Sequence, residues 1–143
     1  MRVLLDTTFL LPTLGIDTGR EALQALTRLD ERRAQICYSP LSLLECLWIV
    51  ARLSKTAAVR QEGFEEGLRS IARSGRYEPI AEPPEAYAEA LRLHRAGHRD
   101  MIDNMLYADS VHLNIRFLTL DEGLRNFVRS RRLKDTLISP SEL

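Results

Sequence analysis

Cysteine is scarce in this sequence, and a long apolar run is absent. The two cysteines, Cys37 and Cys46, have no CxxC spacing, so we expect small buried side chains rather than a disulfide framework or a cysteine-bound metal. No apolar segment approaches the roughly 20 residues that a membrane-spanning helix needs. Asp6 interrupts the apolar stretch at the N terminus, which disfavours a signal peptide. We therefore expect no membrane partner, and a cytoplasmic location as the default.

An excess of positive charge is also missing. Lys and Arg together number 20, as do Asp and Glu, which gives a formal net charge of zero. Proteins that hold nucleic acids through the phosphates alone are usually basic, so any such binding must depend on local patches and on metal ions. Only Lys55 and Lys134 are lysines. The resulting arginine bias suits phosphate recognition, but it also follows from coding bias or heat adaptation.

The pattern of apolar residues indicates one α/β domain over residues 1–143, a length typical of a single domain. Short apolar segments with the character of buried strands lie at 2–6, 35–39, 77–80, 115–120 and 136–139. Segments with amphipathic or capped patterns typical of helices lie at 17–33, 40–51, 55–73, 84–96, 101–113 and 121–132. This alternation predicts a three-layer α/β/α sandwich with a central, mostly parallel sheet of about five strands. In the helix at 40–51, the apolar face is expected to consist of Leu41, Leu44, Leu47, Trp48 and Ala51.

Two acidic residues follow predicted strands. Asp6 closes the strand at 2–6, and Asp121 comes directly after the strand at 115–120. Sites in open parallel sheets form beyond the carboxyl ends of the strands, so both side chains should lie at the same edge. A carboxylate at the end of a buried strand is costly unless it has a partner. Asp121 could also be no more than the N-cap of the next helix.

Three further acidic residues stand on helices. Glu45 lies within the apolar pattern LSLLECLWIV, although taken alone it is better explained as a residue at the rim of the core. Asp100 and Asp103 lie at the start of the helix at 101–113, where they can form an acidic variant of the capping box. The helix dipole that favours an acid there also keeps its carboxylate ionised, which a metal ligand needs. Capping and metal binding are therefore compatible roles.

Taken in order, these acidic segments resemble the PIN-domain family, and within it the VapC-type toxins and their archaeal relatives. The strand that ends in Asp and Thr is VLLDTTFLLP, the acid inside an apolar helix is in SLLECLWIV, and the last two acids are in MIDNMLYADSVHLNIRFLTLDEGL. The closing segment LISPSEL resembles the last strand of the family, so the resemblance covers residues 2–143. It implies a PIN-like fold and a ribonuclease.

The resemblance also implies a metal site and partners. By position, the catalytic and metal-binding acids would be Asp6, Glu45, Asp103 and Asp121. The side chains that support these ligands would be Thr7, Thr8 and Thr119, with Asp100 as an additional acid beside the site. The metal would be Mg²⁺ or Mn²⁺, the substrate RNA, and the partners a second copy of the chain or an antitoxin encoded alongside. Thr8 is a departure, since relatives often have Ser or Asn there.

Phosphodiester hydrolysis can use a group of acidic residues to bind a divalent metal ion. Carboxylates alone would repel the substrate, whereas a hard cation such as Mg²⁺ takes oxygen ligands and usually keeps several waters. One or two such ions can activate water, orient the scissile phosphate and stabilise the developing charge. In this scheme the three aspartates hold the metal, and Glu45 holds a water at the metal or helps to deprotonate it.

Basic residues flank the last two acids of the set. The candidates for RNA phosphate contacts are Arg99, Arg125 and Arg129. For each of them a solvated helix face is at least as good an interpretation. Aromatic residues for base stacking are sparse, and Tyr107 and Phe127 are better explained as core residues.

No pattern of histidines or hydroxyls indicates nucleophilic catalysis. His94 and His98 are four residues apart, but Gly97 is expected to end their helix. A zinc site would also need further ligands at good geometry. We therefore expect His94, His98 and His112 to be polar surface residues, or at most contacts to RNA.

The sequence leaves two other functions open. A haloacid dehalogenase-type phosphatase also begins with a strand that ends in Asp, but its DxD motif needs an acid where Thr8 stands. Its later catalytic lysine could only be Lys55 or Lys134. The other alternative is a PIN-like fold kept as a binding or scaffold module. Decayed members lose acids first, and this chain has all four, which favours the nuclease.

Overall fold

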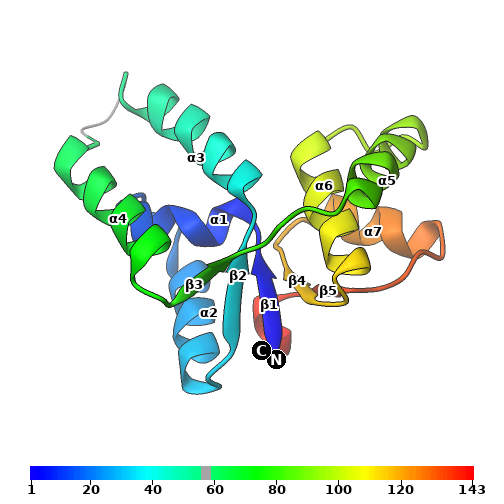
Figure 1. Ribbon diagram of the computed structural model, residues 1–143, viewed down its shortest axis with the longest axis horizontal. Helices are drawn as coiled ribbons and strands as arrows, with labels where there is room; N and C mark the ends of the chain where they lie inside the picture. The colour runs from blue at the N-terminus through cyan, green and yellow to red at the C-terminus, as the bar shows by residue number, and fades with distance from the viewer. Residues whose placement is uncertain (56–58) are drawn as a thin grey trace.

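The computed structural model describes residues 1–55 and 59–143, and it has a five-stranded sheet at its centre (Figure 1). The strands are β1 (Arg2–Leu5), β2 (Gln35–Tyr38), β3 (Tyr77–Pro79), β4 (Arg116–Leu118) and β5 (Leu137–Ile138). They lie in the order β3-β2-β1-β4-β5, and every neighbouring pair is parallel. The predicted α/β sandwich with a sheet of about five strands is confirmed.

Helices connect the strands and cover both faces of the sheet (Figure 1). The α-helices are α1 (Thr7–Leu10), α2 (Arg20–Glu31), α3 (Pro40–Leu53), α4 (Gln61–Arg73), α5 (Pro84–Arg95), α6 (Met101–His112) and α7 (Glu122–Ser130). Two short 3₁₀ segments are η1 (Leu11–Leu14) and η2 (Pro140–Glu142). None of the helices in the described part of the chain has the length and apolar character needed to cross a membrane.

Two of the predicted helices begin later than expected. Helix α2 begins at Arg20 instead of Asp17, because Asp17 Oδ1 accepts a hydrogen bond from the Gly19 backbone N at 2.8 Å and so forms a turn. Gly19 has a φ of 94°, a conformation that glycine adopts without strain. The helix expected at 55–73 begins at Gln61, and residues 56–58 of that prediction lie outside the described residues.

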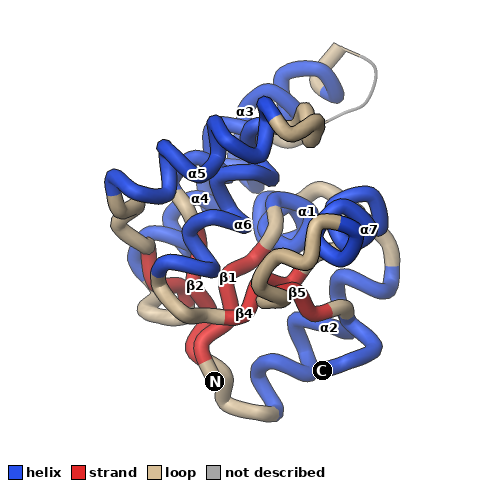
Figure 2. The backbone as a smooth tube through the Cα atoms, turned by 90° about the vertical axis from the view of Figure 1, so that its right-hand side faces the viewer, coloured by secondary structure: helices blue, strands red, loops and turns tan. Residues whose placement is uncertain are grey.

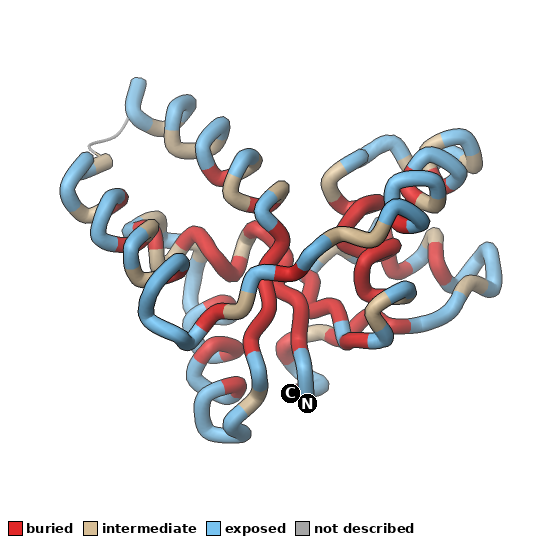
Figure 3. The backbone as a smooth tube through the Cα atoms, viewed as in Figure 1, coloured by how far each residue is buried: buried red, intermediate tan, exposed pale blue. Residues whose placement is uncertain are grey.

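Side chains of the strands alternate between two apolar clusters. Val3 and Leu5 pack with α1, α2 and α4 on one face, while Leu4 packs with α6 and α7 on the other. The central strands are consequently buried from both sides (Figure 3). Burial on both faces is typical of parallel sheets, and it explains why the strand segments are almost continuously apolar in the sequence.

The residues predicted to be small or aromatic core residues lie in these clusters. Cys37 and Cys46 are free, buried thiols. The Tyr107 ring is buried, and its hydroxyl donates to the Lys134 carbonyl at 2.7 Å. Phe127 is partly buried and packs against the second cluster. The core interpretation of these side chains is confirmed.

Helix α3 buries a different face from the one expected. The apolar pattern placed Leu44, Leu47 and Trp48 on the packed face, but they are 43%, 47% and 58% exposed. Cys46 is buried instead, and Leu43 packs against the first cluster. Nearly every residue of this helix is apolar, so two faces fit the pattern and the sequence could not distinguish them.

One edge of the sheet gathers the residues that follow the strands. Because the strands are parallel, Asp6 after β1, Ser39 after β2 and Thr119 after β4 lie at the same edge. Figures 1 and 2 show α3 and α6 above this edge. Side chains from these two helices can therefore meet those that end the strands.

Candidate metal centre

Asp6 lies at the carboxyl end of β1, between that strand and β4. Its backbone N donates to the Leu118 carbonyl at 3.1 Å, which continues the β1–β4 ladder by one residue. Asp6 is 8% exposed, and its Oδ2 accepts a hydrogen bond from Thr119 Oγ1 at 2.7 Å. The chain thus buries an acid at the sheet edge and supplies one hydroxyl to hold it.

Thr119 connects Asp6 to the next acid along the edge. Its hydroxyl donates to Asp6 and accepts a hydrogen bond from the Asp121 backbone N at 3.0 Å. Asp121 Oδ1 in turn accepts from Leu124 N at 2.8 Å, so Asp121 is the N-cap of α7. Gly123 leaves room for this carboxylate, since a Cβ there would lie 3.0 Å from Asp121 Oδ1.

Asp100 and Asp103 approach the same edge from the start of α6. Asp100 is the N-cap, and its Oδ1 accepts a hydrogen bond from Asp103 N at 3.1 Å. Asp103 in the first turn is only 8% exposed. The predicted capping role of Asp100 is therefore present, and the same geometry turns the buried Asp103 toward Asp121, with which it forms a side-chain hydrogen bond.

Glu45 faces this group from α3. It is half-buried, and its Oε2 accepts a hydrogen bond from the buried Thr7 hydroxyl at 2.6 Å. Thr7 directly follows Asp6, so this bond fixes the glutamate beside the first acid. Thr8 is half-buried, and its backbone carbonyl accepts from the Thr18 hydroxyl at 3.2 Å. The supporting role expected of the Thr8 side chain stays a prediction.

The crowding of these acids shifts their protonation. The pKa of Asp103 is raised to about 9, first by burial and then by the charge of Asp6, with smaller contributions from Asp121 and Asp100. Burial also raises the pKa of Asp6 to about 6, against the Thr119 hydrogen bond and together with the charge of Glu45. These acids, distant in sequence, therefore act on one another electrostatically.

The pKa of Asp121 is lowered, in contrast to the raised pKa values of Asp6 and Asp103. Burial alone would raise the pKa of Asp121, but hydrogen bonds from Leu124 and Gly123 backbone N–H groups and from Asp103 outweigh it and lower the pKa. The site therefore contains one carboxylate held ionised beside another that burial holds protonated while no cation is bound.

Comparison with known proteins shows which family the chain is similar to. A family model described as the PIN domain matches residues 3–129. The chain belongs to the PIN-domain family. The resemblance drawn from the acidic motifs is confirmed, and the phosphatase alternative is set aside. PIN domains are generally nucleases that use divalent metals, so family membership supports a nuclease role for this protein.

Solved PIN-like structures share the fold across nearly the whole chain. A chain of the VapBC2 complex from Rickettsia felis, bound to a promoter DNA fragment, has a TM-score of 0.67 at 16% identity, covering 97% of this chain and 98% of that one. A toxin-antitoxin complex from Klebsiella pneumoniae gives 0.61 at 16% identity, with 99% of both chains covered. FitAcB from Neisseria gonorrhoeae gives 0.59 at 16% identity, also with 99% of both covered. No curated protein sequence matches significantly.

The donor atoms of this PIN domain fit a divalent metal. One carboxylate oxygen each from Asp103 and Asp121 and one ring nitrogen of His98 lie within 4.8 Å of one another. Within residues 1–55 and 59–143, none of the four predicted acids forms an ion pair with Lys or Arg. A cation would supply the missing positive charge and favour the ionised form of the buried acids.

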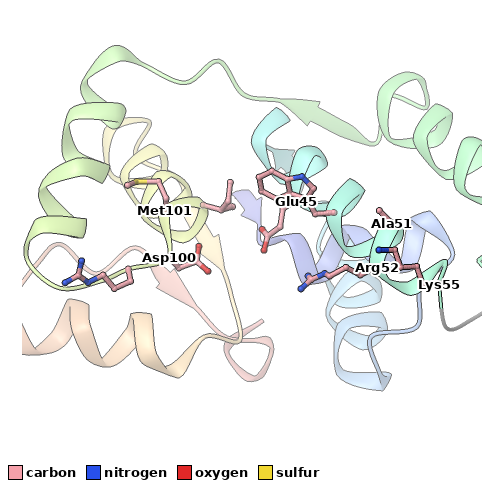
Figure 4. A pocket seen from close by; sticks show the side chains of 9 residues that line it. Glu45, Ala51, Arg52, Lys55, Asp100 and Met101 are labelled. Atoms are coloured by element: carbon pink, nitrogen blue, oxygen red, sulfur yellow. The ribbon is translucent and has the colours of Figure 1, made fainter.

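A cleft next to the acids separates α3 from the start of α6. Its volume is about 690 Å³, and it is lined by Glu45, Trp48, Ala51, Arg52, Lys55, Arg99, Asp100, Met101 and Ile102. Figure 4 shows Glu45 and Asp100 facing each other across it, with Arg52 on the same helix as Glu45. Three of its lining residues, Arg52, Lys55 and Arg99, are basic. Arg99 was among the predicted phosphate contacts, whereas Arg52, about two helical turns after Glu45 on α3, was not.

Arg125 and Arg129, two of the predicted RNA contacts, differ in burial. Arg125 is buried, with Nη2 3.3 Å from Glu142 Oε2 in η2, which leaves its guanidinium little exposed surface for the phosphate contact expected of it; that contact stays a prediction. Glu142 belongs to η2, outside helix α7, so no local pattern indicated that pairing. Arg129 is exposed, but it lies about two helical turns along α7 from the N-cap Asp121.

His98, expected to be a polar surface residue or at most an RNA contact, lies beside the acids. It is half-buried instead of lying on the surface, and its ring packs against Phe127 with centroids 5.3 Å apart. Its place two residues before the N-cap Asp100 was the available signal.

Proposed function

We propose that this protein is an endoribonuclease that hydrolyses RNA phosphodiesters with Mg²⁺ or Mn²⁺. The observation that carries the proposal is the meeting of Asp6, Asp103 and Asp121 at one sheet edge, with Glu45 beside them and no basic ion partner in the described residues. When they are ionised, acids crowded in this way destabilise the fold unless a cation is bound, which supports a role in holding one.

Each acid has a distinct part in the mechanism. Asp6, Asp103 and Asp121 would hold the cation, and the Thr119 hydroxyl orients Asp6 for that purpose. A bound divalent cation supplies Lewis-acid stabilisation of the phosphate charge. Glu45, held by Thr7, would accept a proton from the attacking water. Catalysis would then rest on two carboxylate roles, ligation and proton transfer, assigned to different elements of the fold.

The substrate would lie in the cleft between α3 and α6. Arg52, Lys55 and Arg99 line it and would contact phosphates, which positions the strand without reading its bases. RNA binding is compatible with a net charge of zero, because these three basic residues need to hold only the few phosphates near the scissile bond. The aromatic ring of Trp48, 58% exposed at the same cleft, offers a surface on which a base can stack.

A toxin role completes the proposal. The structural relatives from Rickettsia felis and Klebsiella pneumoniae come from toxin-antitoxin complexes, which supports an antitoxin partner here. Exposed apolar side chains stand on the two helices α3 and α5, namely Leu44, Leu47, Trp48, Tyr87 and Leu91. Such side chains favour a protein partner, either an antitoxin or a second copy in a homodimer. The cytoplasm, where RNA and antitoxin meet, is the location we propose.

An RNA panel tests the function directly. Purified protein should cleave at least one single-stranded or structured RNA with Mn²⁺ or Mg²⁺, and chelator should reduce cleavage to background. The Asp103→Asn variant should be inactive on the same RNA, and an exposed control, Asp30→Asn, should cleave normally. Cleavage that persists in chelator would contradict the metal mechanism. Bound metal without cleavage of any RNA would favour a scaffold module instead.

A further inference from the structure

A histidine stands beside the acids of the candidate metal centre. One ring nitrogen of His98 belongs to the group of donor atoms within 4.8 Å of one another that also includes Asp103 and Asp121. The ring is held on two sides. Asn104 Oδ1 lies 2.7 Å from His98 Nδ1, and Phe127 packs against the ring with centroids 5.3 Å apart. The imidazole is therefore placed by its neighbours before any ligand arrives.

The contacts of Asn104 determine which nitrogen of His98 is free. Asn104 is fully buried, and its Nδ2 donates to the His98 backbone carbonyl at 2.8 Å. This bond fixes the amide orientation and leaves Oδ1, an acceptor only, facing Nδ1. Nδ1 must therefore carry the proton. In the neutral ring, Nε2 is then left with its lone pair available.

This arrangement is the one that metal-bound histidines show. Such a histidine usually donates its other ring N–H to an oxygen, which fixes the tautomer and orients the ring. Here the Asn104 amide supplies that oxygen. A histidine needed only for packing would not require a buried amide locked by a second hydrogen bond, because the Phe127 contact alone covers one face of the ring.

We propose that His98 is a nitrogen ligand of the metal through Nε2, together with Asp103 and Asp121, and that it makes the site select transition-metal ions over Mg²⁺. The inference rests on the metal site of the proposed function. Mg²⁺ takes oxygen ligands almost exclusively, whereas imidazole binds Co²⁺, Zn²⁺ and, less strongly, Mn²⁺. A mixed set of one nitrogen and several carboxylate oxygens therefore favours the ions later in the Irving–Williams order.

Calorimetric titration of the full chain with MgCl₂, MnCl₂ and CoCl₂ measures this selectivity without any substrate. The His98→Gln variant should bind Co²⁺ at least about tenfold more weakly than the parent, while its Mg²⁺ affinity should change by less than about threefold. His112→Gln is the matched control, since His112 is an exposed residue at the far end of α6. Its affinities for all three ions should equal those of the parent.

A spectroscopic measurement separates ligation from a positioning role. In long-range ¹H–¹⁵N spectra of the parent with Zn²⁺, the Nε2 resonance of His98 should shift far more than those of His94 and His112. Equal losses of Co²⁺ and Mg²⁺ affinity in His98→Gln, or an unshifted Nε2, would overturn the nitrogen-ligand proposal while leaving the nuclease proposal intact. A parent protein that binds none of the ions would overturn both.

Discussion

The Asp6→Asn variant should lose metal-dependent RNA cleavage, with kcat at least about 100-fold below that of the parent. Asn keeps the size of the side chain, and its Oδ1 can still accept the hydrogen bond from Thr119. The variant lacks only the negative charge that a cation needs and that strains the buried cluster. Single-turnover cleavage of a labelled RNA at saturating Mn²⁺ measures the loss, and the urea midpoint reports folding.

An exposed aspartate provides the control for Asp6. Asp17→Asn removes a carboxylate from a surface turn in which Asn can accept the same hydrogen bond from Gly19. This control should retain full activity and stability. If Asp6→Asn cleaved RNA as fast as the parent, or if it simply unfolded, the role assigned to Asp6 would be wrong.

The metal-free protein should lose stability as the pH rises, and Asp103 should account for most of the effect. The pKa of Asp103 is raised from 3.8 to about 9 by burial and by neighbouring acids. The folded state therefore keeps a proton that the unfolded chain releases between about pH 4 and pH 9, so the free energy of unfolding falls across that window. Asp6, with its pKa raised to about 6, adds to the decline at its acidic end.

Replacing Asp103 with Asn should remove most of this dependence on pH. The neutral amide keeps the shape of the protonated acid, so the metal-free variant should be more stable than the parent at pH 8, by about 1.4 kcal/mol for each pH unit in which only the folded parent keeps the proton. Urea unfolding in chelator at pH 5, 6.5 and 8 measures both proteins. Parallel curves for the two proteins across this range would contradict the assignment of the pH dependence to Asp103.

With bound Mn²⁺, the parent should become more stable than Asp103→Asn, the reverse of the order without metal. With free Mn²⁺ at about 100 times its Kd, the parent should gain about 2.7 kcal/mol. For a chain of this size, that gain corresponds to a rise in Tm of roughly 5 to 10 °C. Asp103→Asn should gain far less, because it lacks one ligand charge. An equal rise in both proteins would show that Mn²⁺ binds elsewhere.

Part of this site could be predicted because it depends on local rules. Asp6 and Asp121 follow strands, and parallel strands bring their carboxyl ends to one edge. Asp100 precedes a helix, so its capping bond followed from sequence position alone. The residues around Glu45 did not by themselves indicate a site residue. Only the order of all the acidic motifs along the chain indicated that Glu45 belongs to the site.

The rest depends on contacts between distant segments. Arg125 looked like a surface cation on α7, yet its partner Glu142 belongs to the last turn of the chain. The ring of His98 is oriented by Asn104 and by Phe127, which lies in another helix. Periodicity also failed for α3, where apolar residues on every side left the buried face undetermined. Tertiary packing decides each of these cases.

Diffraction from a crystal grown with Mn²⁺, recorded at a wavelength where manganese scatters anomalously, tests the central claim most directly. The account predicts an anomalous peak within about 2.0 to 2.6 Å of carboxylate oxygens from Asp6, Asp103 and Asp121. A well-ordered crystal with no peak at that edge, or with these carboxylates turned away toward arginines, would contradict it.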